Sequence, residues 1–316
     1  MNTSRIKFPL LSLLLPLLAL TSSCDRAIYD SMEDCPRGVY INVYEQTSCD
    51  PQRLYPREAE TLQLFAFDAG GTFVGMQEET GVTLSPEYEV MVPVGPAGSY
   101  SFVVWAGLTA DKFDLSGLTV GRSTKADLLA QLKRANGTAA SLMGKRVFVG
   151  ETPAVAVGEV QNLFPHTEAN VREITNRISL KMIGFLTSSN YDVTLSAANT
   201  DYSVKGDLLT SESVLYPTEV MYPDERTLTA FYTTLKLDGL QDCKIVLTEK
   251  ETGKVILEEN LIQAIKDSLV GGNINFACDN DFDIEIDVTR LMDGFLGFSL
   301  KINGWLIHSY DVDLGK

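Results

Sequence analysis

The chain alternates apolar and polar residues with a period of two from Val39 almost to its end. Val39, Ile41 and Val43 open the pattern, and it returns at 62–67, 88–94, 100–104, 191–195, 282–288 and 296–302. Because successive side chains of a strand point to opposite faces, such alternation predicts half-buried β-strands. Turn signals separate the stretches, including Asp68-Ala69-Gly70-Gly71 and Asn303-Gly304. The pattern predicts an all-β protein of antiparallel β-sandwiches.

Two short helices are predicted to interrupt the strands. The first follows a capping box of Thr124 and Asp127, has Leu128, Leu129 and Leu132 on one face, and ends at Asn136-Gly137. The second contains Leu261, Ile262, Ile265 and Leu269, and ends at Gly271-Gly272. The length of 316 residues favours two domains in tandem. We place them at residues 38–172 and 173–316.

The first residues have the pattern of a secretory signal peptide. Arg5 and Lys7 precede an apolar run from Pro9 to Leu20, which is shorter than the ~20 residues that span a bilayer. Small residues then lead to Cys24, and this resembles the lipobox of bacterial lipoproteins, although Leu20 stands four residues before the cysteine where three is usual. We predict cleavage after residue 23, lipidation of Cys24 and a tether over residues 24–37. An ordinary signal peptide is the alternative.

The acidic residues of the tether are either a sorting signal or a means of keeping it solvated.

Charge and cysteine content narrow the class of protein further. The net charge of −16 disfavours nucleic acid as a partner, because the chain repels phosphate backbones. Besides Cys24, an exported chain carries an even number of cysteines, which predicts disulfides among Cys35, Cys49, Cys243 and Cys278. We favour the pairs Cys35–Cys49 and Cys243–Cys278, because each lies within one predicted domain. Free buried thiols are the alternative.

The residues give little support for catalysis or for a bound cofactor. The two histidines, His166 and His308, lie in no ligand or catalytic motif, and we predict that both are structural or surface residues. The carboxylate row Asp279, Asp281, Asp283, Glu285 and Asp287 could attract Ca²⁺, but it lacks the glycine of a calcium loop. Its alternation favours a solvated outer face of a strand. Trp105 and Trp305 could serve as sugar platforms, but their apolar surroundings favour the core. We therefore expect no enzyme, no cofactor, no metal and no small-molecule substrate.

Several motifs in order resemble one known family. They are Cys35-Pro36 before the first strand, the strand–turn–strand Leu64–Val74, the tripeptide Trp105-Ala106-Gly107, the basic strand Asn176–Lys181, and the segment Ile302–Trp305. This combination is similar to the FimB-type fimbrial anchor family of Bacteroidales lipoproteins, over nearly the whole mature chain.

The resemblance implies two transthyretin-like domains in an outer-membrane lipoprotein at the base of a fimbrium, or pilus. Such a protein holds the stalk to the cell surface, limits its length and binds stalk subunits by strand addition. We expect the C-terminal strands to donate to a stalk subunit or to lie beside its docking edge, with contacts at Leu296, Phe298, Leu300, Trp305 and Ile307. The alternatives are a stalk or tip subunit, a surface glycan-binding lipoprotein, and ordinary internal strands at these positions.

Overall fold

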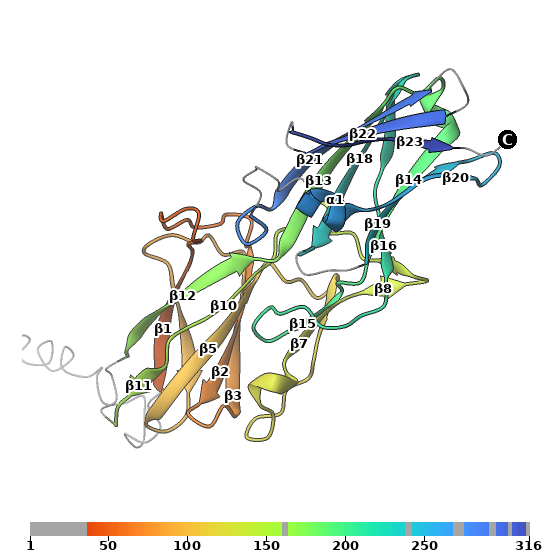
Figure 1. Cartoon of the computed structure of the whole chain (residues 1–316). Helices are drawn as coiled ribbons and strands as arrows, with labels where there is room; N and C mark the ends of the chain where they lie inside the picture. The colour runs from red at the N-terminus through yellow and green to blue at the C-terminus, as the bar shows by residue number, and fades with distance from the viewer. Residues whose placement is uncertain are drawn as a thin grey trace, which may run out of the picture.

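The computed structural model describes residues 37–159, 164–237, 242–267, 275–290, 295–302 and 305–313. These residues form an elongated, almost entirely β-structured molecule with two halves (Figure 1). The first half lies at the lower left of the view, around β1, β5 and β12, and the second half lies at the upper right, around β13, β18 and β22. The predicted all-β class is confirmed.

The first half is one large sheet in the order β3-β2-β5-β10-β12-β1-β4, with β11 paired to β5. The strands are β1 (Arg37–Glu45), β2 (Thr61–Asp68), β3 (Phe73–Thr80), β4 (Glu89–Val94), β5 (Gly98–Ala106), β10 (Phe148–Glu151), β11 (Val155–Val157) and β12 (His166–Glu173). Strands β3 and β4, at opposite ends of this order, lie against each other, so the sheet folds over one apolar face. Val39, Ile41, Leu62, Leu64 and Phe102 are buried inside it.

The second half is a sandwich of two sheets. One has the order β17-β18-β13-β21-β22-β23 and the other has the order β20-β19-β14-β16-β9-β8. Their strands are β8 (Arg134–Ala135), β9 (Thr138–Ala139), β13 (Thr175–Ile183), β14 (Tyr191–Ala197), β16 (Val214–Tyr216), β17 (Val220–Asp224), β18 (Thr227–Leu235), β19 (Cys243–Glu249), β20 (Val255–Asn260), β21 (Asp281–Arg290), β22 (Phe295–Ile302) and β23 (Trp305–Asp313). Alternate residues of β13, β14, β18, β19 and β21 fill the space between the sheets.

The predicted helix after Thr124 is wrong. The capping box exists, but it closes only a single 3₁₀ turn, η3 (Lys125–Asp127), and the chain then enters strand β7 (Leu129–Leu132). Strand β7 lies between β6 (Phe113–Leu115) and β15 (Asp201–Ser203), and β15 comes from the second half of the chain. Leu128, Ala130 and Leu132 are buried at a spacing of two. Long-range pairing therefore overrides the local helix signal.

The second predicted helix is present as α1 (Leu261–Asp267), while Leu269 and its glycine pair lie outside the described residues. A further 3₁₀ turn, η4, covers Ser188–Asn190. In the portion of the chain that the structure describes, no helix is both long and apolar enough to cross a membrane.

The sheets are mainly antiparallel, but each half contains a parallel pair of long strands, and β9 makes one further parallel contact with β16. Strand β1 runs parallel to β12, with Glu45 opposite Val171. Strand β13 runs parallel to β21, with Arg177 opposite Asp281. Because β12 leads almost directly into β13, the pairs β1–β12 and β13–β21 follow one another along the molecule. We call the junction between the halves, where β12 ends at Glu173 and β13 begins at Thr175, the waist.

Candidate functional site

The predicted lipidation site, Cys24, lies outside the described residues, and so does Cys35. The described chain begins with β1, whose first residue, Arg37, pairs with Val94 at the end of β4. Strand β1 ends near the waist at Glu45, so Arg37 is at the pole away from the waist. A tether that precedes β1 would leave the molecule at that pole.

The predicted partner-binding residues lie on the last two strands. Leu296, Phe298 and Leu300 belong to β22, which stands between β21 and β23. Trp305 and Ile307 belong to β23, which pairs with β22 alone among the described strands. The register sets Phe298 opposite Val288 and Leu300 opposite Ile286, two residues whose side chains are buried in the core. The backbone of β23 is therefore an edge of the sheet, while β22 is an interior strand.

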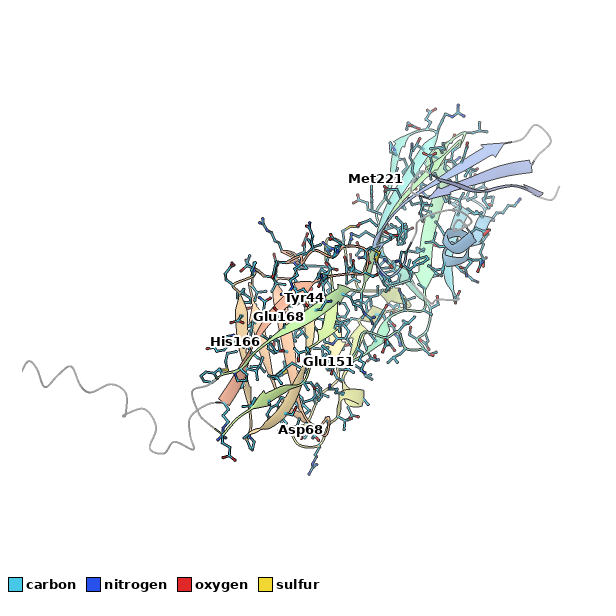
Figure 2. The ribbon with its side chains drawn as sticks, turned by 60° about the vertical axis from the view of Figure 1, so that its left-hand side comes forward. Tyr44, Asp68, Glu151, His166, Glu168 and Met221 are labelled. Carbon is cyan, nitrogen blue, oxygen red and sulfur yellow. A yellow bond between two sulfur atoms is a disulfide. The ribbon has the colours of Figure 1, made fainter. Side chains whose placement is uncertain are left out.

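Trp105 is fully buried, as its apolar surroundings predicted. It cannot serve as a sugar platform. His166 is at the surface, where its Nδ1 lies 2.9 Å from a carboxylate oxygen of Glu89 and its ring stacks on Tyr40. This position agrees with the prediction of a structural or surface residue. Figure 2 shows His166 in the same half of the molecule as Tyr44, Asp68 and Glu168, with Met221 in the other half.

Four acids of the carboxylate row, Asp281, Asp283, Glu285 and Asp287, lie on the outer face of β21, in agreement with their alternation, whereas Asp279 precedes the strand. Phe282, Ile284, Ile286 and Val288 point into the core, and the acidic residues between them point away from it. Two acids pair with the neighbouring strand β13, Asp281 with Arg177 at 2.5 Å and Glu285 with Lys181 at 3.3 Å. Within the described ranges, no group of three or more His, Cys, Asp or Glu side chains is arranged to hold a metal ion.

The favoured disulfide pairs are wrong. Cys49 bonds to Cys278 across 229 residues of sequence, with their Cα atoms 6.1 Å apart. Cys243 is free, and burial raises the pKa of its thiol to about 12. The prediction assumed that each bridge stays within one half of the chain. Instead the loop after β1 meets the loop before β21 at the waist, whereas Cys243 faces the core of the second half opposite Ala197.

A buried carboxylate lies at the same waist. Glu173, the last residue of β12, has no exposed side-chain surface. Its two oxygens receive hydrogen bonds from Arg146, Arg177, Thr175 and Asn280, and the two guanidinium contacts are 2.5 Å long. The network extends outward, since Arg177 also pairs with Asp281, and Lys236 donates to Asn280 at 2.6 Å. We call Glu173, Arg146, Arg177 and Asn280 the waist cluster.

The electrostatics of the waist cluster keep Glu173 ionised. Burial works to raise the pKa of Glu173, but hydrogen bonds from Arg146, Arg177 and Thr175 outweigh it and hold the pKa below its ordinary value. Nearby Glu45 has the opposite shift, because burial and the charge of Glu173 both raise its pKa. The waist cluster therefore holds the charges of Glu173, Arg146 and Arg177 in place between the two halves.

Sequence reasoning missed the waist cluster, because its members are far apart in sequence and each is an ordinary charged or polar residue. One signal was available: Glu173 and Arg177 both lie within five residues of the predicted domain boundary. Opposite charges beside a domain junction indicate a polar contact that both domains share.

Comparison with known proteins identifies the family. A family model described as fimbrillin-A associated anchor proteins Mfa1 and Mfa2 matches residues 32–311. The minor fimbrium anchoring subunit Mfa2 of Porphyromonas gingivalis is 34% identical over 299 residues, which are 93% of this chain and 92% of that protein.

Solved structures agree with this result. The fimbrial anchor protein Mfa2 from Porphyromonas gingivalis has a TM-score of 0.79 at 33% identity, over 87% of this chain and 100% of that one. A candidate adhesin from Bacteroides ovatus has a TM-score of 0.71 at 16% identity, over 87% of this chain and 96% of that one, which shows a shared fold alone. The chain belongs to the family of fimbrillin-A associated anchor proteins, which are structural subunits of fimbriae and not enzymes.

Proposed function

We propose that this chain is an outer-membrane lipoprotein that anchors a fimbrium to the cell surface and limits its length. The observation that carries the proposal is the match to the minor fimbrium anchoring subunit Mfa2 over 93% of the chain. Two or three acyl chains on Cys24 would hold the protein stably, since each buried methylene contributes ~0.8 kcal/mol. The protein faces the exterior from the base of the fimbrium.

The layout of the molecule supports an anchor. The tether over residues 24–37 leads into Arg37 at one pole, while β21 runs from the waist toward the opposite pole and β22 and β23 follow it (Figure 1). Membrane attachment and stalk attachment are then at opposite ends. In this proposal residues 38–172 form the domain next to the membrane and residues 173–316 form the domain next to the stalk. Strands β7 and β9 cross this division, because β7 pairs with β15 and β9 pairs with β16 of the second half.

We assign the stalk contact to the edge of β23. An extended segment of a stalk subunit would add to this edge through main-chain hydrogen bonds, and alternate side-chain pockets would give specificity. Leu296, Phe298, Leu300, Trp305 and Ile307 are the residues of β22 and β23 that we assign to the contact. Docking on β23 is favoured over donation of β22, because β22 is paired on both sides.

The test compares Cys24→Ala with the wild type by measuring fimbrial subunits on cells and in the medium. We expect the variant to release fibres into the medium. If fibres stay attached while the variant protein itself is shed, the anchor function is wrong.

A stalk or tip role is distinguished by the N-terminus of the protein in assembled fibres. An anchor keeps its lipid on Cys24, whereas a chain found to begin after Arg37 or later would be a stalk or tip subunit. The burial of Trp105 weighs against the glycan-binding alternative, which needs exposed aromatic residues.

A further inference from the structure

Besides the excursion of the chain through β8 and β9, two covalent connections join the first half to the second at the waist. The first is the peptide chain from Glu173 through Ile174 to Thr175, which joins β12 to β13. The second is the Cys49–Cys278 disulfide, which joins the loop after β1 to the loop before β21. Strand β1 is the parallel neighbour of β12, and β21 is the parallel neighbour of β13. The peptide therefore links β12 to β13, and the disulfide links the loops of their neighbours, β1 and β21.

The surroundings of the disulfide hold both loops in place. Asn275 Nδ2 donates to Cys49 Sγ at 3.3 Å, and Ser48 Oγ lies 3.6 Å from Cys278 Sγ. On the side of the first half, Gln46 N donates to Asn170 Oδ1 at 2.9 Å, which attaches the loop to β12. On the side of the second half, Arg177 N donates to the carbonyl oxygen of Asn280 at 2.7 Å, which attaches the other loop to β13.

The waist cluster adds a buried electrostatic contact beside these two connections. Arg146 comes from the segment before β10 in the first half, whereas Arg177 and Asn280 belong to the second half, and all three meet on Glu173. Bending or pulling the halves apart would expose a carboxylate that is now fully buried and separate it from its guanidinium partners. Paired buried charges resist such separation, because each ion left alone is costly.

We propose that the Cys49–Cys278 disulfide and the waist cluster form a mechanical clamp that transmits tension between the two poles. Tension that enters at Arg37 passes along β1, through the disulfide and into β21, without passing along the residues between the two cysteines. The clamp rests on the proposed anchor function for its purpose, because only an attached fibre pulls on the protein. The mechanical behaviour of the clamp, in contrast, can be tested on the purified chain without a fibre.

Single-molecule force spectroscopy on the purified mature chain tests the mechanics, with peptide tags at both ends as handles. The oxidised wild type should release less chain than the Cys49→Ser/Cys278→Ser variant. The difference should be roughly 800 Å, because 229 residues remain enclosed and each extended residue spans ~3.5 Å. Wild type with reductant should release the same length as the variant, and Cys243→Ala should behave as the oxidised wild type. Equal released lengths for the oxidised wild type and the double variant would overturn the clamp.

A measurement on cells in shear flow tests whether the clamp helps the cell to retain its fibres under tension. Cells carrying the Cys49→Ser/Cys278→Ser variant should keep their fibres at rest and lose them at lower shear than wild-type cells. Circular dichroism first establishes that the variant is folded, and reductant applied to wild-type cells gives a second comparison. If the folded variant holds fibres under flow as well as the wild type does, the clamp proposal is overturned. Cys24→Ala at rest reports on the anchor function separately, so the two failures are distinguishable.

Discussion

At the scale of single residues, the buried charge of Glu173 is expected to stabilise the waist, because it is the shared partner of Arg146 and Arg177. Glu173→Gln keeps the shape of the side chain but leaves Arg146 and Arg177 without their shared counter-charge. We expect a loss of about 3 kcal/mol in the free energy of unfolding, at the lower end for a broken buried pair, because both guanidinium groups are partly exposed. Urea unfolding at neutral pH measures it. Glu168→Gln is the matched control, since its pair with Arg53 is about half exposed and should contribute less than about 1 kcal/mol. Equal losses in the two variants would contradict this account.

The same residue predicts a dependence on pH. The pKa of Glu173 is lower in the folded protein than its ordinary value of 4.5, so its ionised form favours folding. Its stabilising effect is complete above pH 4.5 and is lost as the pH falls from there through the folded pKa. The difference in unfolding free energy between wild type and Glu173→Gln should therefore be constant near neutral pH and shrink below pH 4.5. A difference that grows on acidification would show that the sign is wrong.

Gly107, which follows Trp105-Ala106 at the end of β5, is required by its backbone. Its φ is +81°, and a Cβ placed there would lie 2.0 Å from the carbonyl oxygen of Arg146. We expect Gly107→Ala to cost more than about 2 kcal/mol, because the left-handed conformation alone costs roughly 1–2 kcal/mol for other residues. Gly117→Ala is the control, since nothing lies within 4 Å of its Cβ position. Thermal unfolding of both variants measures the difference, and similar melting temperatures would refute the prediction.

At the scale of elements, alternation in the sequence is enough to predict many of the strands. The prediction at Val39–Val43 corresponds to β1, the one at 62–67 to β2, and the one at 282–288 to β21. In β21 the alternation of the residues matches the alternation of burial, whereas residues 62–67 of β2 are buried on both faces, because Leu62 and Leu64 pack in one core cluster and Phe65 and Phe67 in the other. Strand β7 was missed because Leu128 to Leu132 fits both periods, and its strand partner β15 lies about 70 positions later in the chain.

Strand β23 carries the prediction that belongs to this scale. A chain truncated after Gly304 lacks β23 and should lose binding to stalk subunits, because the docking edge has been removed. Near-UV circular dichroism checks that the truncated chain is folded, and co-purification with stalk subunits measures binding. Val255→Lys alters an exposed residue on β20, the edge strand of the other sheet, and should leave binding unchanged. A folded, truncated chain that still binds stalk subunits would exclude β23 as the contact.

At the scale of the whole molecule, the contacts that join the two halves could not be predicted. The disulfide prediction used proximity in sequence, whereas Cys49 and Cys278 meet only because two parallel strand pairs follow one another along the molecule. Parallel pairing leaves no local mark in the sequence, since the two strands are joined by a long crossover. Glu173, Arg146 and Asn280 are brought together by the same arrangement.

The clamp also has an equilibrium consequence for the whole molecule. Closing a loop of 229 residues removes conformational freedom from the unfolded chain, and the chain-entropy model gives about 5 kcal/mol of stabilisation. Reductant should therefore lower the denaturant midpoint of the wild type, and the Cys49→Ser/Cys278→Ser variant should unfold at that lower midpoint with or without reductant. Cys243→Ala should still respond to reductant, because its thiol is buried in the core and takes no part in the bridge. Cys49 is exposed at the surface, so reductant reaches the bond in the folded protein and the comparison needs no prior unfolding. A wild-type midpoint that does not move on reduction would contradict the expected contribution of the disulfide to stability.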